Sequence, residues 1–374
     1  MSGSTATTWF CDHNAGGPVA AEVLELFLAT ERSCPGNPAS VHALGRQARS
    51  VLETARQRIG DAYGIAAPDV VFTSGGTEAA NLAVLGLGCA TLPVAAAAVE
   101  HPAVFESAQL RGMIPWDVGA DGVAHIIEPP QEVGLLCLVH AQSELGALQP
   151  VATAATLAAS LEVPLFVDAA QTLGRVPLRP LFDSGAIVAL SPHKAGGLRG
   201  HGVLLGRDLH GQLRPLLRGG GQELGLRPGT QSPALALANA LAIELALRQT
   251  TQRATAMLAV RAAFLRAIAA TGVAHRVLTS LEGSLPNTVM LHFAGVDGRN
   301  LVPALDLAGV QASHGSACSS GAPTPPRILQ AIGLDAIAAR ACVRFSFGAD
   351  DSIEHGQQAG TRVGEVVARR QKKF

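Results

Sequence analysis

The chain has 374 residues, of which 48% are hydrophobic and 15% are charged, and its formal net charge is −1. This length and composition predict a folded enzyme with one large and one smaller domain, and they exclude a disordered chain. The balanced charge provides no electrostatic basis for binding nucleic acid or an anionic membrane surface.

Features of a membrane or secreted protein are not expected. The mean hydropathy is +0.28, but the apolar runs are rich in Ala, interrupted by Gly or Pro, and shorter than the roughly 18–20 residues of a spanning helix. The first residues have neither the basic start nor the apolar core of a secretory signal. Six cysteines, at 11, 34, 89, 137, 318 and 342, form no CxxC pair and no zinc-binding spacing. We therefore expect a reduced, cytoplasmic protein without a metal site.

Short apolar runs alternate with helical stretches from about residue 50 to residue 210. The runs predicted as strands buried on both faces are 70–74, 94–99, 134–139, 165–168, 187–190 and 203–205. This alternation is typical of an α/β domain with a mainly parallel sheet. Ligands bind such sheets just beyond the strand ends, where polar residues stand at 74–77, 100–101, 168–171 and 191–194.

The second half of the chain predicts a different domain. Residues 233–270 form a long helical stretch rich in Ala and Leu that leads into it. A strand at 288–293, a helix at 300–307, a loop at 313–326, a short helix, a strand at 342–347 and a C-terminal helix are expected to follow. We predict a large domain over 14–248 and a small domain formed by 1–13 and 249–374. The Gly-, Ser- and Pro-rich loop is either a mobile functional segment or an ordinary surface loop.

Lys194 and Asp168 are candidates for cofactor chemistry. Lys194 follows a buried strand, where desolvation lowers the pKa of an amine and favours a Schiff base with an aldehyde. Asp168 ends another strand, where a fixed carboxylate can keep a pyridine nitrogen protonated, and Gln171 could bond the ring hydroxyl. The alternatives are a structural ion pair for Lys194 and a helix cap for Asp168.

Two further strand ends carry candidate ligands. Residues 74–78, SGGTE, begin a helix whose free backbone N–H groups and dipole favour phosphate, with a hydroxyl from Thr77; the same sequence is a good helix cap. His101 precedes Pro102, which suits a first helical turn. The imidazole could stack on a cofactor ring and move protons, or it could simply cap the helix.

Motifs along nearly the whole chain occur in a recognisable order. They are CDHNA (11–15), NPASVH (37–42), VFTSGGTE (71–78), EHPAV (100–104), VDAAQ (167–171), SPHK (191–194), GGGQELGLRPGT (219–230), SHGSACSS (313–320) and VRFSFG (343–348). With these motifs the chain resembles the class V aminotransferase superfamily of fold-type I pyridoxal-phosphate enzymes. Within it, the chain resembles the group I cysteine desulfurases of iron–sulfur cluster assembly. The resemblance implies a mainly parallel seven-stranded sheet, a smaller α+β C-terminal domain and pyridoxal 5'-phosphate as cofactor.

The resemblance also implies roles for individual residues. Lys194 matches the Schiff-base lysine, Asp168 the partner of the pyridine nitrogen, Gln171 the partner of the ring hydroxyl, and His101 the ring-stacking acid or base. The residues that match phosphate ligands are Gly76, Thr77, Ser191, His193 and Thr230. Because Thr230 matches a contact made by the neighbouring subunit, a homodimer is implied.

The resemblance implies a substrate and a sulfur acceptor as well. Arg344 matches the arginine that binds the substrate carboxylate, with Asn14 and Ser143 beside it. Cys318 matches the cysteine that takes sulfur from L-cysteine as a persulfide, leaving L-alanine, and passes it to an acceptor or scaffold protein for iron–sulfur cluster or thio-cofactor assembly. Without the resemblance, Cys318 would be interpreted as an incidental loop thiol.

Two departures from the family pattern leave alternatives open. Ser143 stands where an asparagine commonly helps to bind the substrate carboxylate. Residues 15–17 read AlaGlyGly where the family favours AlaThrThr, which removes hydroxyls near the site. A selenocysteine lyase, another class V aminotransferase and a catalytically idle binding or regulatory homologue are therefore the alternative functions.

Overall fold

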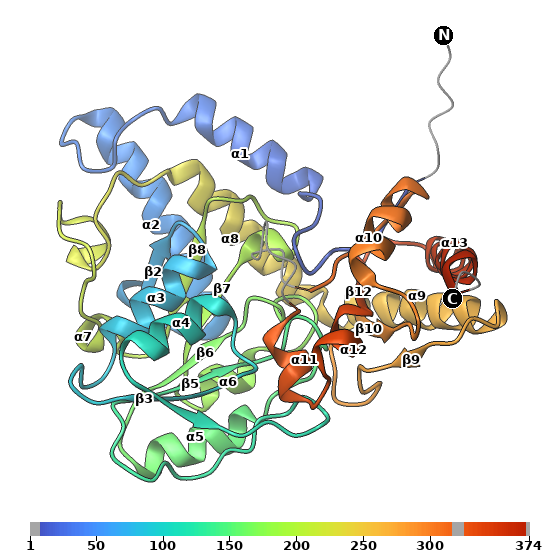
Figure 1. Cartoon of the computed structure of the whole chain (residues 1–374). Helices are drawn as coiled ribbons and strands as arrows, with labels where there is room; N and C mark the ends of the chain where they lie inside the picture. Colours follow the sequence, from blue (N-terminus) through green and yellow to red (C-terminus); the bar gives the residue numbers. More distant parts are fainter. Residues whose placement is uncertain (1–7, 316–324, 372–374) are drawn as a thin grey trace.

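The computed structural model describes residues 8–315 and 325–371. The chain forms a large lobe around a central sheet and a smaller lobe that contains the C-terminal helix (Figure 1). The sheet has seven strands in the order β2-β8-β7-β6-β5-β3-β4. Their bounds are β2 (Val70–Thr73), β3 (Val94–Ala97), β4 (Met113–Trp116), β5 (Leu135–Val139), β6 (Leu165–Asp168), β7 (Ile187–Leu190) and β8 (Gly202–Leu205).

The pairing of the strands confirms the predicted, mainly parallel sheet. β3 pairs in parallel with β4 and β5, and β6 pairs in parallel with β5 and β7. Only β8 is antiparallel to its neighbours, so β2 runs in the same direction as β7. β4 was not predicted, because its sequence MIPW contains a proline and is only partly buried at the sheet edge.

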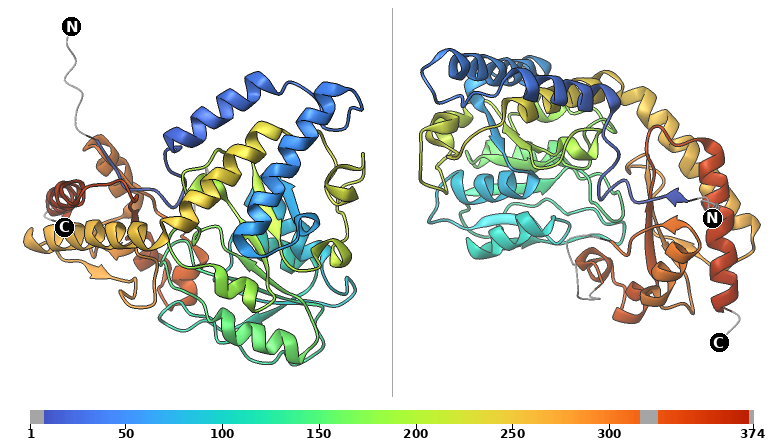
Figure 2. Two further views of the ribbon diagram at one scale, coloured as in Figure 1. Left: turned by 180° about the vertical axis from the view of Figure 1, so that it is seen from behind. Right: turned by 90° about the horizontal axis from the view of Figure 1, so that it is seen from above.

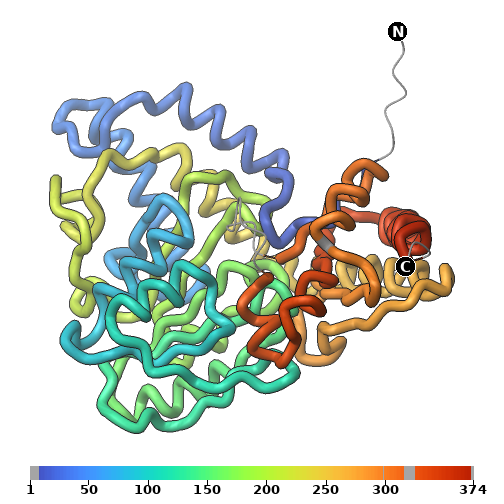
Figure 3. Tube along the Cα trace, viewed as in Figure 1, coloured from blue at the N-terminus to red at the C-terminus, as the bar shows by residue number. Residues whose placement is uncertain are grey.

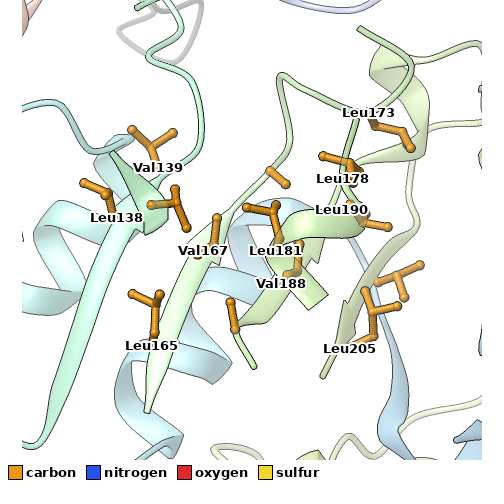
Figure 4. Close-up of a cluster of buried hydrophobic side chains, with 14 of the residues drawn as sticks. Leu138, Val139, Leu165, Val167, Leu173, Leu178, Leu181, Val188, Leu190 and Leu205 are labelled. Carbon is orange, nitrogen blue, oxygen red and sulfur yellow. The ribbon is translucent and has the colours of Figure 1, made fainter. Parts of the chain in front are cut away.

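Both faces of the sheet are buried, as the continuous apolar strands predict. Leu138, Val167 and Val188 belong to the apolar cluster on one face, together with side chains of α6 (Arg179–Asp183) (Figure 4). Their neighbours Cys137, Phe166 and Ile187 belong to the cluster on the other face. Successive residues of a strand point to opposite faces, so one run of apolar residues serves both clusters.

Helices cover each face. The first cluster includes residues of α2 (Ala43–Tyr63), α5 (Val151–Ser160) and α8 (Pro233–Arg248). The other includes residues of α3 (Gly76–Gly86), α4 (Pro102–Leu110) and α7 (Leu209–Gln212). With helices on both faces, the open edge at the carboxyl ends of the strands is the place left for a ligand.

The helical stretch predicted at 233–270 is interrupted at Gln249. α8 ends there, where φ is −101° and ψ is 6°, and α9 (Thr250–Ala270) begins. α8 packs against α1 (Ala21–Ser33) and α2, whereas α9 packs against α13 (Ile353–Gln371). The two helices therefore connect the large lobe to the small one, as the view from above shows (Figure 2).

The small lobe has its own sheet and buried cluster. β10 (Thr288–His292) pairs antiparallel with β12 (Cys342–Ser346) and β9 (Arg276–Val277). The other elements are α10 (Gly298–Leu307), β11 (Val310–Gln311), α11 (Arg327–Ala331) and α12 (Ala336–Arg340). The cluster includes Phe264, Phe293, Phe345 and Phe347.

The first and last described elements both belong to the small lobe (Figure 3). β1 (Trp9–Phe10) pairs in parallel with β11, and α13 packs on α9. This arrangement agrees with a small domain made from both ends of the chain, although the boundaries at 13/14 and 248/249 stay a prediction. None of the helices in the described ranges is long and apolar enough to cross a membrane.

Candidate active site

A cavity of about 170 Å³ lies at the carboxyl ends of the central strands. Of the predicted site residues within the described ranges, all except Thr230 line it: Asn14, Gly76, Thr77, His101, Ser143, Asp168, Gln171, Ser191, His193, Lys194 and Arg344. They come from five different strand ends, from the N-terminal segment and from β12. The fold therefore brings these distant motifs together at one cavity. The chemical roles of the residues stay predictions.

The turn between β2 and α3 forms a cradle for an anion. α3 begins at Gly76, so the first backbone N–H groups of the helix and its dipole are directed at this end of the cavity. A Cβ atom at Gly76 would overlap the Oγ atom of Ser191. Glycine therefore allows the turn to approach the end of β7 without displacing the Ser191 hydroxyl, and Thr77 and Ser191 line the same cavity.

His193 and Lys194 lie in a 3-10 helix, Pro192–Lys194, that follows β7 directly. Burial, together with the neighbouring cations Lys194 and Arg199, lowers the pKa of His193 to about 4. His193 is therefore a neutral imidazole that can donate or accept one hydrogen bond in the cavity.

Asp168 ends β6 and is 8% exposed. Its Oδ1 atom accepts a hydrogen bond of 2.9 Å from the backbone N–H of Ala170. The carboxylate is thus held in a turn and also lines the cavity. The next helix after β6 is α6, which begins only at Arg179, so the alternative that Asp168 caps a helix is wrong.

His101 caps α4 and lines the cavity at the same time. Its Nδ1 atom accepts a 3.1 Å hydrogen bond from the N–H of Ala103, which leaves the proton of the neutral ring on Nε2. Burial is the main cause of its lowered pKa; Asp168 and Glu144 oppose the shift, and Lys194 adds to it. His101 is therefore a neutral ring whose Nε2–H is the group able to move a proton.

Arg344 projects from β12 and is 1% exposed. Its Nη2 atom lies 2.6 Å from Oδ1 of Asp12, and its Nη1 atom donates a 3.2 Å hydrogen bond to the carbonyl of Ser143. Within the described residues, its buried Nε atom has no acceptor. The guanidinium is therefore fixed in direction and keeps hydrogen-bonding capacity for a carboxylate.

The side chain of Asn14 is used within the protein. Its Nδ2 atom donates to the Ser143 carbonyl (3.0 Å) and to Thr288 Oγ1 (2.9 Å). Its Oδ1 atom accepts from Arg175 (2.8 Å) and Asn287 (3.0 Å). Because both amide hydrogens and both lone pairs have partners, Asn14 positions its neighbours in this structure, and direct contact with a substrate stays a prediction.

Ser143 and Gln171 also have internal partners. The hydroxyl of Ser143 donates a 2.7 Å hydrogen bond to Glu144, so its single proton is not directed at a ligand. Gln171 donates to the carbonyl of Asn14 (3.1 Å) and accepts from Arg175 (2.7 Å). One amide hydrogen of Gln171 remains for the predicted ring hydroxyl.

Arg175 was not singled out from the sequence. It is 4% exposed, and it donates to Gln171, Asn14 and the backbone carbonyls of His13 and Lys194. Burial is the main cause that lowers its pKa to about 9. The only local signal is its position four residues after Gln171, one helical turn away.

Glu100 is among the polar residues expected at the strand ends, at 100–101, but the sequence assigned it no role of its own. Glu100 follows β3 and is 3% exposed. Its Oε1 atom accepts a 2.8 Å hydrogen bond from the N–H of Val139, the last residue of β5. Burial, together with the nearby charge of Asp168, raises its pKa to about 8. A carboxylate directly after an apolar run is the local signal that could have indicated a buried, neutral acid at this position.

Thr230 is the one predicted site residue of the described ranges that lies elsewhere. Thr230 is exposed and does not line the cavity of its own chain. That position is required if Thr230 completes the site of a second subunit, which stays a prediction. Cys318 lies outside the described residues.

The AlaGlyGly departure at 15–17 has a structural counterpart. A Cβ atom at Gly17 would lie 3.3 Å from Nδ1 of His13, and one at Gly348 would overlap the same ring. His13 also lies 3.4 Å from the carboxylate of Asp351. The imidazole therefore occupies part of the space beside Gly17, where both residues line a second cavity of about 330 Å³ that also reaches Lys194.

Comparison with known proteins gives consistent results. The family Aminotransferase class-V matches residues 9–355. Cysteine desulfurase IscS from Dictyoglomus turgidum is 30% identical over 352 residues, which cover 91% of this chain and 89% of that protein. A solved NifS-like protein has a TM-score of 0.87 and 27% identity, covering 97% of this chain and 100% of its own. A solved structure of SspA in complex with cysteine has a TM-score of 0.76 and 27% identity, covering 91% and 99%.

These matches span both lobes and every strand end that lines the cavity. The chain belongs to the class-V aminotransferase family.

Proposed function

We propose that the protein is a pyridoxal-phosphate-dependent cysteine desulfurase that acts as a homodimer. It converts L-cysteine to L-alanine and transfers the sulfur, as a persulfide on Cys318, to an acceptor protein. The observation that carries this proposal is the single cavity that combines the anion cradle, Asp168, Lys194 and Arg344. Relatives that match most of the chain are cysteine desulfurases, and one structural neighbour was solved with cysteine.

The residues of the cavity fit the cofactor. The cradle at Gly76, which has no room for a Cβ atom, and the hydroxyls of Thr77 and Ser191 suit its phosphate. Asp168 suits the ring nitrogen, and Lys194 suits the aldehyde. When bound, pyridoxal phosphate supplies an aldehyde for Schiff-base chemistry and a protonated ring that accepts electrons from the substrate carbon.

The residues of the chain have distinct tasks in this reaction. Arg344, directed by Asp12, binds the carboxylate of cysteine through its remaining donors. Asp168 keeps the ring nitrogen protonated. Lys194 and the Nε2 atom of His101 hold or move the protons at the substrate carbons.

The sulfur transfer balances without an external oxidant. The carbon–sulfur bond of cysteine breaks, and a sulfur–sulfur bond forms with the thiolate of Cys318. The substrate carbon that loses sulfur gains a proton, so that the products are alanine and a persulfide. The electron pair of the attacking thiolate forms the new bond, and the electron pair of the broken bond remains on carbon.

The experiment that tests this function follows alanine and sulfur together. The cofactor-loaded protein is incubated with L-cysteine, alanine is measured, and mass spectrometry is used to look for one added sulfur on Cys318. We expect one sulfur per alanine, no persulfide in Cys318→Ala, and no alanine from Lys194→Ala.

Other outcomes support the alternatives. Full turnover of cysteine or selenocysteine by Cys318→Ala would indicate a lyase, and turnover that depends on an oxo-acid would indicate an aminotransferase. A protein that shows no absorption band of lysine-bound cofactor after supplementation would be an idle homologue.

A further inference from the structure

Arg327 joins the small lobe to the corner between β3 and α4. It is the first residue of α11, and its Nη2 atom donates a 3.0 Å hydrogen bond to the carbonyl of Glu100. Its Nε atom donates to the carbonyl of Ala98 at 3.4 Å. Its Cζ atom lies 3.4 Å from the centroid of the Phe105 ring. One guanidinium therefore holds the turn after β3 and the first turns of α4 together.

The held corner carries His101. Glu100 precedes it directly, and Phe105 lies one helical turn after it, with its N–H bonded to the His101 carbonyl at 3.0 Å. The imidazole itself caps α4 through Ala103. The direction of the His101 ring therefore depends on the conformation of the segment that Arg327 holds on both sides.

The charge environment keeps Arg327 in its cationic form. Burial lowers its pKa, and the carboxyl groups of Glu144, Glu100 and Glu106 oppose that shift. An arginine has such a high intrinsic pKa that it stays protonated under these conditions. The groups whose charges act on His101 are thus Asp168, Lys194, Glu144 and Arg327.

The described residues on either side of 316–324 meet at the same place. A Cβ atom at Gly315 would overlap Pro326, the neighbour of Arg327, and would lie 3.2 Å from Cγ of Glu144. Glu144 in turn accepts the hydrogen bond of Ser143. Pro326 therefore packs against Gly315, beside the residues that follow β5.

We infer that Arg327 is a positioning residue for the proposed reaction, which holds the β3–α4 corner so that the Nε2–H of His101 faces the cavity. The inference rests on the proposed function for its kinetic effect. Arg327 does not line the cavity, so it acts through His101 and not on the substrate.

The test compares Arg327→Ala and Arg327→Lys with Arg362→Ala. Arg362 is a matched control because it also lies in the small lobe and donates through Nε to a backbone carbonyl, that of Ala308, far from the cavity. We expect Arg327→Ala to lower kcat for alanine formation by on the order of 10- to 100-fold with KM for cysteine nearly unchanged. Arg327→Lys keeps the charge but not the planar stacking, and should recover part of kcat. Arg362→Ala should match wild type.

A second measurement uses the cofactor-free protein. The titration of His101 is followed by NMR. The signal of its ring is assigned as the one that is absent from the spectrum of His101→Gln. In Arg327→Ala the pKa of His101 should rise toward its ordinary value, because a nearby cation is lost and the loosened corner admits water. In Arg362→Ala it should stay at the wild-type value.

The two measurements separate this inference from the proposed function. If wild type makes no alanine from cysteine, the proposed function fails, and the His101 titration alone decides the role of Arg327. An unchanged titration, or a kcat for Arg327→Ala within about twofold of wild type, would overturn the inference. Equal losses of kcat, cofactor affinity and unfolding temperature would also overturn it, because they would make Arg327 a general structural residue.

Discussion

Side chains around the cavity divide into those bonded within the protein and those with capacity for a ligand. Asn14 has four internal hydrogen bonds, and Ser143 gives its only proton to Glu144. Arg344 keeps a donor, because its buried Nε atom has no acceptor among the described residues, and His101 lines the cavity while its Nδ1 atom caps α4. The hydrogen-bond partners of a polar side chain, and not its presence at the cavity wall, therefore decide which residues can bind a substrate.

Substitution of Ser143 tests this distinction. Because its hydroxyl donates to Glu144, we expect Ser143→Ala to change KM for cysteine by less than about twofold. Ser143→Asn adds an amide donor beside Arg344 and should lower KM several-fold at unchanged cofactor affinity. Steady-state kinetics of the two variants provide the measurement, and a large rise of KM in Ser143→Ala would show that the hydroxyl does bind substrate.

Glu100 should make stability depend on pH. Its pKa is about 8 in the folded protein and near 4.5 in the unfolded chain, so between these values the folded state binds a proton that the unfolded state has lost. The free energy of unfolding therefore falls as pH rises through this window, by at most about 1.4 kcal/mol per pH unit. Glu100→Gln removes this proton uptake.

Urea unfolding of the cofactor-free protein at about pH 6 and about pH 8 measures the effect. From about pH 6 to about pH 8, the free energy of unfolding of wild type should fall by on the order of 2 kcal/mol more than that of Glu100→Gln. Glu100→Ala is the control for the lost acceptor of the Val139 N–H, and it should be less stable at both. Parallel behaviour of wild type and Glu100→Gln would contradict the assignment of a neutral Glu100.

At the scale of the elements, the carboxyl ends of the parallel strands supply the site. β2, β3, β5, β6 and β7 run in one direction, so the turns that follow them open on one edge of the sheet. Four of these turns contribute one kind of chemistry each: the anion cradle after β2, the imidazole after β3, the carboxylate at β6 and the amine after β7; the turn after β5 contributes Ser143. The division of tasks among separate elements explains why the motifs are far apart in the sequence.

The β2–α3 turn allows a matched pair of glycine substitutions. A Cβ atom at Gly76 would overlap Ser191 Oγ, whereas one at Gly75 has nothing within 4 Å. We expect Gly76→Ala to weaken pyridoxal-phosphate binding by at least about 10-fold, since the backbone N–H groups move away from the phosphate. Gly75→Ala should bind nearly as wild type. Cofactor titration by visible absorption would detect the difference, and equal affinities would argue against the phosphate cradle.

At the scale of the whole molecule, two lobes meet at the cavity. β12 and the N-terminal segment bring Arg344 and Asn14 from the small lobe side to the strand ends of the large lobe. Thr230 is the exception, because it lies outside the cavity of its own chain. A site that needs Thr230 must be shared between two copies of the chain.

Subunit mixing tests this sharing. Lys194→Ala and Thr230→Glu should each be inactive alone, because one lacks the amine and the other repels the phosphate. If each site takes Lys194 from one subunit and Thr230 from its partner, random mixed dimers contain one intact site, and the mixture recovers about a quarter of wild-type activity. Recovery of no activity, or full activity of Thr230→Glu alone, would contradict a shared site.

The sequence by itself determined the strands of the central sheet and the residues at their ends. Apolar runs such as 135–139 and 165–168 are local signals, and the polar residues that follow them are read directly from the chain. β4 and the break at Gln249 were not predicted, because a partly buried edge strand with a proline and a single non-helical residue leave little pattern.

Only the tertiary structure decided which of these residues are free to act. Asn14 is bonded to Thr288, Arg344 to Asp12, and Arg327 to the Glu100 carbonyl, between residues hundreds of positions apart. Burial also decided that Glu100 is neutral and that His101 is uncharged. Hydrogen-bond partners and desolvation depend on how the lobes pack, and no local sequence pattern encodes that packing.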